Sequence, residues 1–247
     1  MEENLKAALE YAVDLRDGQK VIYDEEGKTY YDSNKVSLRE VDPIKYAKTL
    51  TTKSLSGLVD YLKSKFDDQV ADPEPLLIHV EGPTIVNVYS KLDDDRKRES
   101  IIAAAASLDS FPYGKWLDSE EFIINVLSLI RRDLDADAIR QCASQIRIEG
   151  GADLSDNGVS QTVTVKEGAT LNKAEVPSPA DLRPYRTFLE VEQPSSPFIF
   201  RINKRGDCAL FEADGGIWRH EAMANVKEYL AGKLSEEIEA GYLTIIA

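Results

Sequence analysis

The sequence predicts an α+β protein, in which antiparallel hairpins are separated by helices. Three observations lead to this prediction. Some stretches repeat apolar residues every three or four positions, which is the spacing of a helix with one buried face. Other stretches alternate apolar and polar residues, as strands of a sheet with one solvated face do. Turns that contain glycine or proline join neighbouring strands over short distances, which favours hairpins.

The first part of the chain predicts a helix and then a hairpin. Apolar residues recur at helical spacing from Glu2 to Arg16, and the pattern ends near Gly18. Two β-rich runs follow, from Val21 to Tyr23 and from Thr29 to Tyr31. Gly27 supplies the positive φ that a tight turn between them requires.

A second helix is predicted after Thr52, whose side chain can cap the helix N-terminus. Pro73 and Pro75 stop the pattern. The expected buried stripe consists of Leu55, Leu58, Val59, Leu62 and Phe66.

Two strands are predicted next, from Leu76 to Val80 and from Thr84 to Ser90, paired across the turn at Gly82. The segment from Arg96 to Ser107 fits two structures. Its alanines favour a helix, whereas the short apolar run from Ile101 to Ala106 suits a buried strand. We favour the strand.

Two helices are predicted in the middle of the chain. Asp118 and Glu121 have the three-residue spacing of a capping box. The expected buried stripe of that helix consists of Phe122, Ile123, Val126, Leu127 and Ile130. Asp135 is predicted to start the other helix, which carries Ile139 and Cys142.

Beyond Cys142 the apolar period changes from 3.6 to 2. Ile146 and Ile148 are predicted to begin a hairpin that returns from Val159 to Val165, around a turn at Asn157 and Gly158. The stretch from Lys173 to Pro184 contains three prolines and is expected to break this pattern.

The last part of the chain predicts strands, a closing helix and a final strand. The strands run from Phe188 to Val191, Phe198 to Ile202 and Cys208 to Glu212, with the last two joined around Gly206. The helix extends from Arg219 to Lys233, and the final strand from Leu243 to Ile246.

Length and composition predict a single α+β domain over residues 1–247. A chain of 247 residues buries about 70% of its unfolded surface on folding, so it needs no disulfide or metal to be stable. Within this domain, residues 1–35 are an N-terminal arm in one interpretation, and residues 144–247 are the sheet-rich part.

Charge and apolar runs restrict the partners of the chain. There are 44 acidic and 30 basic side chains, and the resulting net charge of −14 repels phosphate backbones, so we do not expect direct nucleic-acid binding. No apolar run has the roughly 20 residues that span a bilayer, and the charged segment from Met1 to Glu10 does not resemble a signal peptide. We therefore expect a cytoplasmic protein without a membrane partner.

The sequence contains none of the nucleotide, hydrolase or zinc motifs that tie residue spacing to a mechanism. His79 is interpreted as a half-exposed strand residue, and His220 as a helix-terminus or interface residue. Cys142 and Cys208 are interpreted as buried thiols, which fit a reducing compartment. We therefore predict no catalytic residue, no cofactor-binding or metal site, and no cofactor.

One charged run leaves an enzymatic alternative open. Asp93, Asp94 and Asp95 precede Arg96, Lys97 and Arg98, so carboxylates that suit magnesium adjoin cations that suit phosphate. Adjacent carboxylates on a strand point to opposite faces, and the basic residues neutralise them. We favour a solvated surface loop.

Three aromatic residues are candidate interface residues. Phe198 and Phe200 point to one face of a predicted strand, and Trp218 follows the pair Gly215 and Gly216. Core packing is one interpretation. A surface for self-association or for another protein is the other, because aromatic residues are enriched at interfaces.

Five segments of the chain, taken in order, form a recognisable pattern: the N-terminal hairpin with Val36 to Val41, Thr49 to Lys63 (TLTTKSLSGLVDYLK), Trp116 to Val126 (WLDSEEFIINV), Ile146 to Val165 and Ser196 to Leu230. In this order they resemble the YfdQ-like family of uncharacterised tailed-phage and prophage proteins. The resemblance implies phage origin, the bacterial host cytoplasm, and a gene among early recombination or replication functions. It supplies no active site. The polar stretch from Lys166 to Pro184 departs from the family pattern.

These observations favour a non-enzymatic phage accessory protein over an enzyme. We expect it to act by homo-oligomeric assembly or by binding a host or phage protein. One alternative is an acidic partner-binding protein of phage DNA metabolism or counter-defence, whose charge imitates nucleic acid. The other is a nucleotide or phosphate-ester enzyme that uses the run from Asp93 to Arg98.

Overall fold

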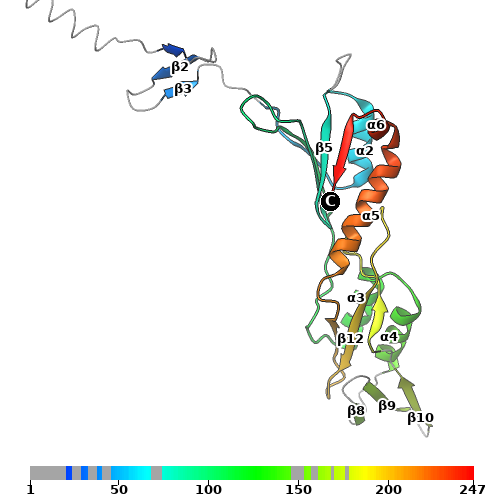
Figure 1. The fold of residues 1–247 in the computed structure, drawn as a ribbon. Coiled ribbons are helices and arrows are strands. Elements are labelled where there is room, and N and C mark those ends of the chain that lie inside the picture. The colour runs from blue at the N-terminus through cyan, green and yellow to red at the C-terminus, as the bar shows by residue number, and fades with distance from the viewer. Residues whose placement is uncertain are drawn as a thin grey trace, which may run out of the picture. The chain divides into compact units, whose positions relative to one another are not determined.

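A computed structural model gives the fold of the chain (Figure 1). It describes residues 46–67, 74–145 and 178–247, together with the strands at 21–23, 29–32, 38–40, 153–156, 161–167 and 170–175. Contacts divide the chain into two compact units, residues 1–47 and 48–247, and each is described by itself below. The described helices and mixed or antiparallel sheets confirm the predicted α+β class.

The first unit contains a small antiparallel sheet. Its strands are β1 (Val21–Tyr23), β2 (Thr29–Asp32) and β3 (Leu38–Glu40), in that order. Val21 lies opposite Tyr31, so the predicted hairpin is confirmed. The helix predicted from Glu2 to Arg16 lies outside the described residues.

The second unit is organised around a five-stranded sheet with the order β14-β5-β6-β7-β4. β5, β6 and β7 form an antiparallel meander, whereas β4 pairs with β7 and β14 pairs with β5 in parallel. The meander confirms the predicted pair of strands, and β7 shows that the apolar run near Ile102 is a strand. The bounds are β4 (Leu50–Thr52), β5 (Leu76–Gly82), β6 (Ile85–Tyr89), β7 (Ser100–Ala105) and β14 (Leu243–Ile246).

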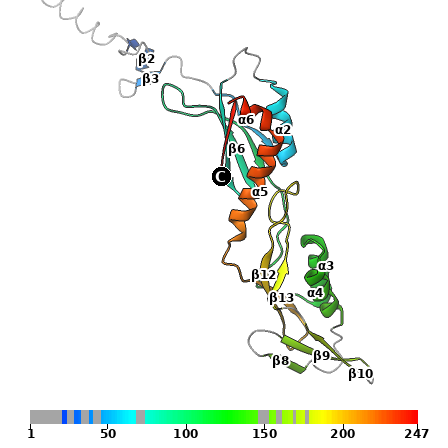
Figure 2. The same ribbon diagram turned by 45° about the vertical axis from the view of Figure 1, so that its right-hand side comes forward.

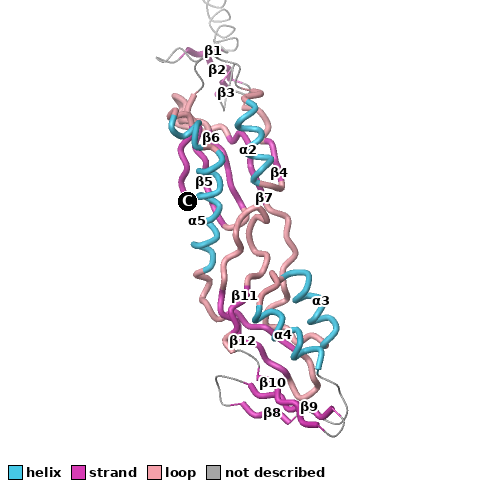
Figure 3. Tube along the Cα trace, turned by 90° about the vertical axis from the view of Figure 1, so that its right-hand side faces the viewer, coloured by secondary structure: helices cyan, strands magenta, loops and turns pink. Residues whose placement is uncertain are grey.

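Three helices cover one face of this sheet: α2 (Leu55–Ser64), α5 (Trp218–Lys233) and α6 (Ser235–Glu239) (Figures 1 and 3). The predicted closing helix and final strand are thereby confirmed. Helix and sheet side chains interlock in what we call the first core. Its members include Leu55, Leu58, Val59, Leu62, Ile78, Val80, Val86, Val88, Ile102, Ala104, Phe188, Val226, Leu230, Leu234 and Leu243.

The ends of α2 differ from the prediction. Ser54, rather than Thr52, caps the helix, because its hydroxyl accepts a hydrogen bond from the N–H of Gly57 at 3.1 Å. Thr52 instead ends β4. The helix stops at Lys65, which has a left-handed φ of 48°, so the chain turns before Phe66, and 73% of that side chain is exposed. The predicted stripe is therefore correct through Leu62 and wrong for Phe66.

A second core joins two helices to a three-stranded antiparallel sheet with the order β11-β12-β13 (Figure 2). Phe122, Val126 and Ile139 of the helices pack against Phe198 and Phe200 of β12. The elements are α3 (Ser119–Leu129), α4 (Leu134–Gln145), β11 (Ala180–Leu182), β12 (Ser196–Ile202) and β13 (Cys208–Glu212). β12 and β13 confirm the predicted pair joined around Gly206.

The helices of the second core begin largely as predicted. Asp118 caps α3 by accepting the N–H of Glu121 at 2.8 Å. For α4 the capping carboxylate belongs to Asp133, which accepts the N–H of Ala136, whereas Asp135 accepts the N–H of Asp181 in β11. Leu127 of α3 was expected in the buried stripe but is 48% exposed. The stripe follows positions 122, 126 and 130, which turns Leu127 away.

Three further strands, β8 (Asp153–Asp156), β9 (Gln161–Glu167) and β10 (Thr170–Glu175), form an antiparallel sheet. Asp156 lies opposite Gln161, which confirms a hairpin at the predicted place. Ile146 and Ile148 lie outside the described residues. The expected break from Lys173 to Pro184 is wrong, because β10 continues to Glu175 and β11 begins at Ala180.

The predicted strand from Phe188 to Val191 is instead a compact turn, which we call the strap (Arg186–Gln193). The buried amide of Gln193 holds it. Its Oε1 accepts the N–H of Arg186 at 2.9 Å, and its Nε2 donates to the carbonyl of Phe188 at 3.0 Å. Because the Gln193 side chain makes hydrogen bonds with these backbone groups, the strap needs no neighbouring strand. Phe188 can therefore enter the first core.

We expect Leu58→Ala to lower the free energy of unfolding by about 2–5 kcal/mol. Leu58 is fully buried between α2 and the sheet, so the substitution leaves a cavity in the first core. Chemical denaturation measures the change. Phe66→Ala is the control, because that side chain lies largely in solvent and its loss should cost less than about 0.5 kcal/mol. A loss below about 1 kcal/mol for Leu58→Ala would contradict the packing described here.

Candidate binding surface

The face of the five-stranded sheet opposite α2, α5 and α6 is the candidate functional surface, and we call it the open face. Its residues alternate with those of the first core along each strand, because neighbouring side chains of a strand point to opposite sides. The open face consists of Thr51, Leu77, His79, Glu81, Ile85, Asn87, Tyr89, Ala103, Ala105, Thr244 and Ile246.

One row of paired residues crosses the centre of the open face. Ile246 lies beside His79, His79 beside Asn87, and Asn87 beside Ala103, which in turn neighbours Thr51 on β4. The register therefore places His79 and Asn87 in the middle of the face, with smaller or apolar side chains on either side.

Six of the eleven residues of the open face are apolar, and the face has no cover among the described residues. Leu77, Tyr89 and Ala103 are half-buried, whereas Ile85 and Ile246 are 42% and 44% exposed. None of these five residues belongs to either core or packs against one. A sheet face of this kind leaves apolar side chains in contact with water, which is the usual mark of an interaction surface when the side chains are contiguous.

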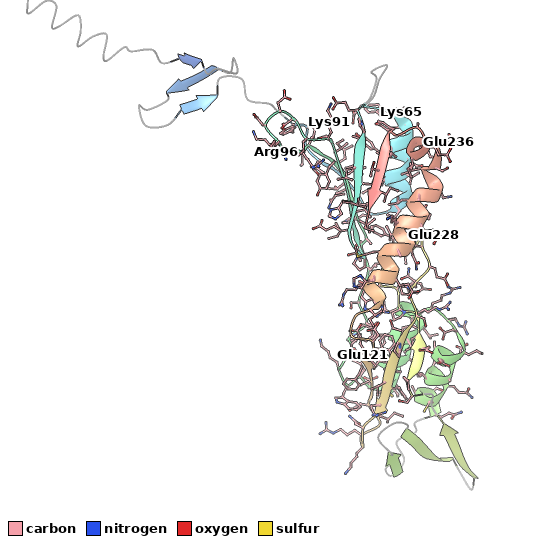
Figure 4. The ribbon with its side chains drawn as sticks, viewed as in Figure 1. Lys65, Lys91, Arg96, Glu121, Glu228 and Glu236 are labelled. Carbon is pink, nitrogen blue, oxygen red and sulfur yellow. The ribbon has the colours of Figure 1, made fainter. Side chains whose placement is uncertain are left out.

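The open face also carries little charge. With histidine counted as neutral, Glu81 is the one charged residue among those of the open face. Its carboxylate accepts a hydrogen bond from the amide of Asn87 at 2.6 Å. By contrast, 30% of the whole chain is charged. Acidic residues such as Glu228 and Glu236 belong to the covering helices α5 and α6 (Figure 4). Interface centres are depleted in charge in the same way.

The aromatic residues proposed from sequence as an interface occupy different positions. Phe198 and Phe200 are 0% and 1% exposed, so their rings belong to the second core rather than to a surface of this chain. Tyr113 stacks on Phe198 with ring centroids 5.3 Å apart, and Phe122 lies 5.4 Å from Phe200. Core packing, the other interpretation of these rings, fits the structure. Trp218 is half-buried at the start of α5.

Trp218 belongs to what we call the Arg186 cluster, where the strap meets β12, β13 and α5. The guanidinium of Arg186 lies 4.1 Å from the centre of the Trp218 ring. It donates to Glu212 at 3.1 Å and to the Ser196 hydroxyl at 2.6 Å. Ser196 in turn donates to Asp214 at 2.8 Å. The cluster thus joins the residues that lead into α5 to the sheet of the second core.

Burial changes the ionisation of the Arg186 cluster. The pKa of Arg186 is lowered by desolvation, and the pKa of Tyr113 is raised by desolvation. The Tyr113 hydroxyl, Arg186 Nε and Trp218 Nε1 have no hydrogen-bond partner among the described residues. Burial of polar atoms without partners is unfavourable, so packing and the Glu212 pair must outweigh it. The cluster is a structural junction between the strap, β12, β13 and α5.

The two cysteines are buried members of the second core, as their sequence spacing predicts. Burial raises the pKa of Cys142 to about 11. Burial, with smaller contributions from Cys142 and Asp207, raises the pKa of Cys208 to about 12. At neutral pH both groups are therefore thiols rather than reactive thiolates.

The remaining residues considered from sequence do not converge on one site. His79 is half-buried on the open face and His220 is exposed near the start of α5. The run from Asp93 to Arg98 forms the turn between β6 and β7 and is held by its own groups. The Asp93 carboxylate accepts the N–H of Lys97 at 2.7 Å, and Lys97 pairs with Asp95 at 3.2 Å. Figure 4 labels Arg96, an exposed residue of this turn.

Within the described part of the chain, no group of three or more His, Cys, Asp and Glu residues could hold a metal ion. No helix described here is long and apolar enough to cross a membrane.

Comparison of this chain with protein-family models, with curated proteins and with solved structures finds no match. The resemblance to YfdQ-like proteins therefore stays a prediction.

Sequence reasoning missed the open face, although part of its signal was visible. The alternation of Ile78, His79 and Val80 predicted a strand with two different faces. Which face is covered depends on α5 and β14, which lie far along the chain, and local periodicity contains no information about that pairing.

We expect Arg186→Lys to lower the free energy of unfolding by about 2–3 kcal/mol, measured by chemical denaturation. Lysine has no planar fork, so it cannot stack on Trp218 while also reaching both Glu212 and Ser196. Arg131→Lys is the matched control. Arg131 is half-exposed and its pair with Glu192 spans 3.7 Å, so the change should cost less than about 0.5 kcal/mol. Equal effects of the two substitutions would mean that the cluster does not hold the junction.

We expect both native cysteines to react with iodoacetamide at pH 8 at least about a hundredfold more slowly than in the unfolded chain. The thiolate is the reactive form, and at pH 8 its population is small because both pKa values are raised by burial. Mass spectrometry follows the labelling. A cysteine introduced by Glu120→Cys, at an exposed position of α3, should react rapidly in the folded protein. Rapid native labelling of Cys142 or Cys208 would show that the second core opens readily.

Proposed function

We propose that this chain is a non-enzymatic protein that acts by assembly or partner binding through the open face. The observation that supports the proposal is an apolar, charge-poor sheet face with no cover among the described residues. Antiparallel sheets often have one solvated face, but such a face normally carries polar and charged side chains. Here Leu77, Ile85, Tyr89 and Ile246 occupy positions where water contact is unfavourable.

The biological setting of this proposal comes from the sequence. The segments that resemble YfdQ-like proteins point to a phage or prophage gene expressed in the bacterial cytoplasm. The proposed partner is another copy of the chain or a host or phage protein.

A second candidate function is binding of a basic protein by the acidic helix side. A groove of about 560 Å³ lies between the strap and α5, and Glu190, Glu192 and Glu228 line it together with Tyr229 and Lys233. Two of these carboxylates already have partners, since Glu190 accepts hydrogen bonds from Ser56 and Glu192 pairs with Arg183. The open face therefore supports the first proposal better than the groove supports this one.

Site-specific photo-crosslinking in cells tests the proposal. A photoreactive phenylalanine analogue replaces Tyr89 on the open face or, in the matched control, Leu134, which is 89% exposed at the start of α4. We expect the probe at position 89 to give a discrete protein adduct on irradiation and the probe at 134 to give none. An interface buries the first position, whereas Leu134 remains in solvent.

Two results would contradict the proposed function. If position 89 gives no adduct, the open face is not a working surface. If positions 89 and 134 give the same adducts, the labelling reflects general exposure rather than a specific contact.

A further inference from the structure

We propose that the occupant of the open face is a second copy of this chain, packed face to face about a twofold axis. This inference rests on the proposed function and names the partner for that surface. Three features of the open face lead to it: its charge, its central polar pair and its area.

Charge favours a neutral contact between identical chains. Each copy carries a net charge of −14, so two copies repel each other wherever acidic surfaces meet. On the open face that repulsion is small, because Glu81 is the one carboxylate among its residues and is hydrogen-bonded to Asn87. A basic partner would gain little from this face, since Glu81 is its one carboxylate and is already hydrogen-bonded to Asn87, whereas Glu228 lies on helix α5 (Figure 4).

The centre of the open face is chemically self-complementary. The imidazole of His79 has no hydrogen-bond partner among the described residues, and it lies beside Asn87 in the central row. A neutral imidazole offers one donor and one acceptor, and an amide offers both kinds of group. A twofold axis presents the same pair from each copy, so the donors of one chain can meet the acceptors of the other.

The area of the open face fits a dimer of moderate affinity. Five strands about 4.8 Å apart, with about five residues each, cover roughly 24 by 17 Å, or about 400 Å² in projection per copy. The accessible surface is larger, because side chains stand nearly perpendicular to the sheet. Two such faces stack about 10 Å apart in a sandwich and bury a total near the lower end of the range for specific interfaces, about 1,200 Å².

Light scattering after size-exclusion chromatography tests this inference with purified full-length protein at about 10–100 μM. We expect a mass of twice 27.5 kDa. Ala103→Asp should weaken the dimer at least about a hundredfold, because the twofold axis buries two new charges for each substitution. Ala103→Lys should weaken it as well, although it makes the net charge less negative. Leu134→Asp, at an exposed position at the start of α4, should leave the dimer intact.

Two measurements keep the test decisive. Thermal unfolding shows whether the Ala103 variants remain folded, and Ile85→Asp, at a more exposed position of the same face, replaces them if they do not. If Ala103→Asp weakens association while Ala103→Lys strengthens it, general charge repulsion explains the result and the face-to-face contact is wrong.

The remaining outcomes separate this inference from the proposed function. A monomer at 100 μM, or a dimer that both Ala103 variants leave intact, overturns the second copy as the occupant. If a monomer still gives the adduct at position 89 in cells, the proposed function survives with a different protein as partner. If the adduct at 89 is an internal link at the mass of one chain, no separate partner occupies the face and both proposals fail.

Discussion

The packing of α5 on the five-stranded sheet is the contact on which the second unit depends. Val226 and Leu230 of α5 are fully buried against the sheet, and the helix delivers the chain to β14. β14 then pairs in parallel with β5, so Leu243 lies beside Leu76. Without this contact only α2 would cover the core side of the meander β5–β6–β7, and a sheet needs a well-packed face to be stable.

The late position of α5 and β14 in the sequence means that the chain visits the first core twice. The second core is built from residues that lie between β7 and α5 in sequence, so the chain leaves the first core and must return to it. The strap makes the return, because Phe188 enters the first core while Arg186 stays in its cluster beside β12. Asn225 of α5 also donates to the carbonyl of Glu192 at 3.0 Å. Neither core can therefore be altered at the strap without effects on the other.

Local sequence patterns predicted the elements better than their partners. The stripe through Leu62, the cap at Asp118 and the alternation in β12 each reflect contacts within a few residues, and all are present in the fold. The parallel pairing of β14 with β5 joins positions far apart in sequence, so no periodicity could reveal it. The strap looked like a strand because Phe188, Leu189 and Val191 gave it an apolar stretch, but the side chain of Gln193 supplies the hydrogen bonds that a neighbouring strand would have given.

Local sequence patterns also could not predict which residues form the candidate surface. Phe198 and Phe200 had the pattern of one strand face, and a pattern cannot distinguish a face covered by α3 and α4 from a face that binds another protein. The His79 side of β5 had a similar pattern and is open. Burial is decided by which helices reach a sheet, and that depends on the whole chain path rather than on the strand itself.

The position of α5 also sets the order in which the protein can fold as it is synthesised. The ribosome completes β7 well before α5, because residues 106–217 are made in between. At about 5–20 residues per second, the delay is on the order of ten seconds. During that time the apolar side chains of β5, β6 and β7 have only α2 to cover them. The nascent chain therefore exposes an incomplete sheet to the cell for longer than most hairpins take to form, and it presents a target for chaperones until α5 emerges.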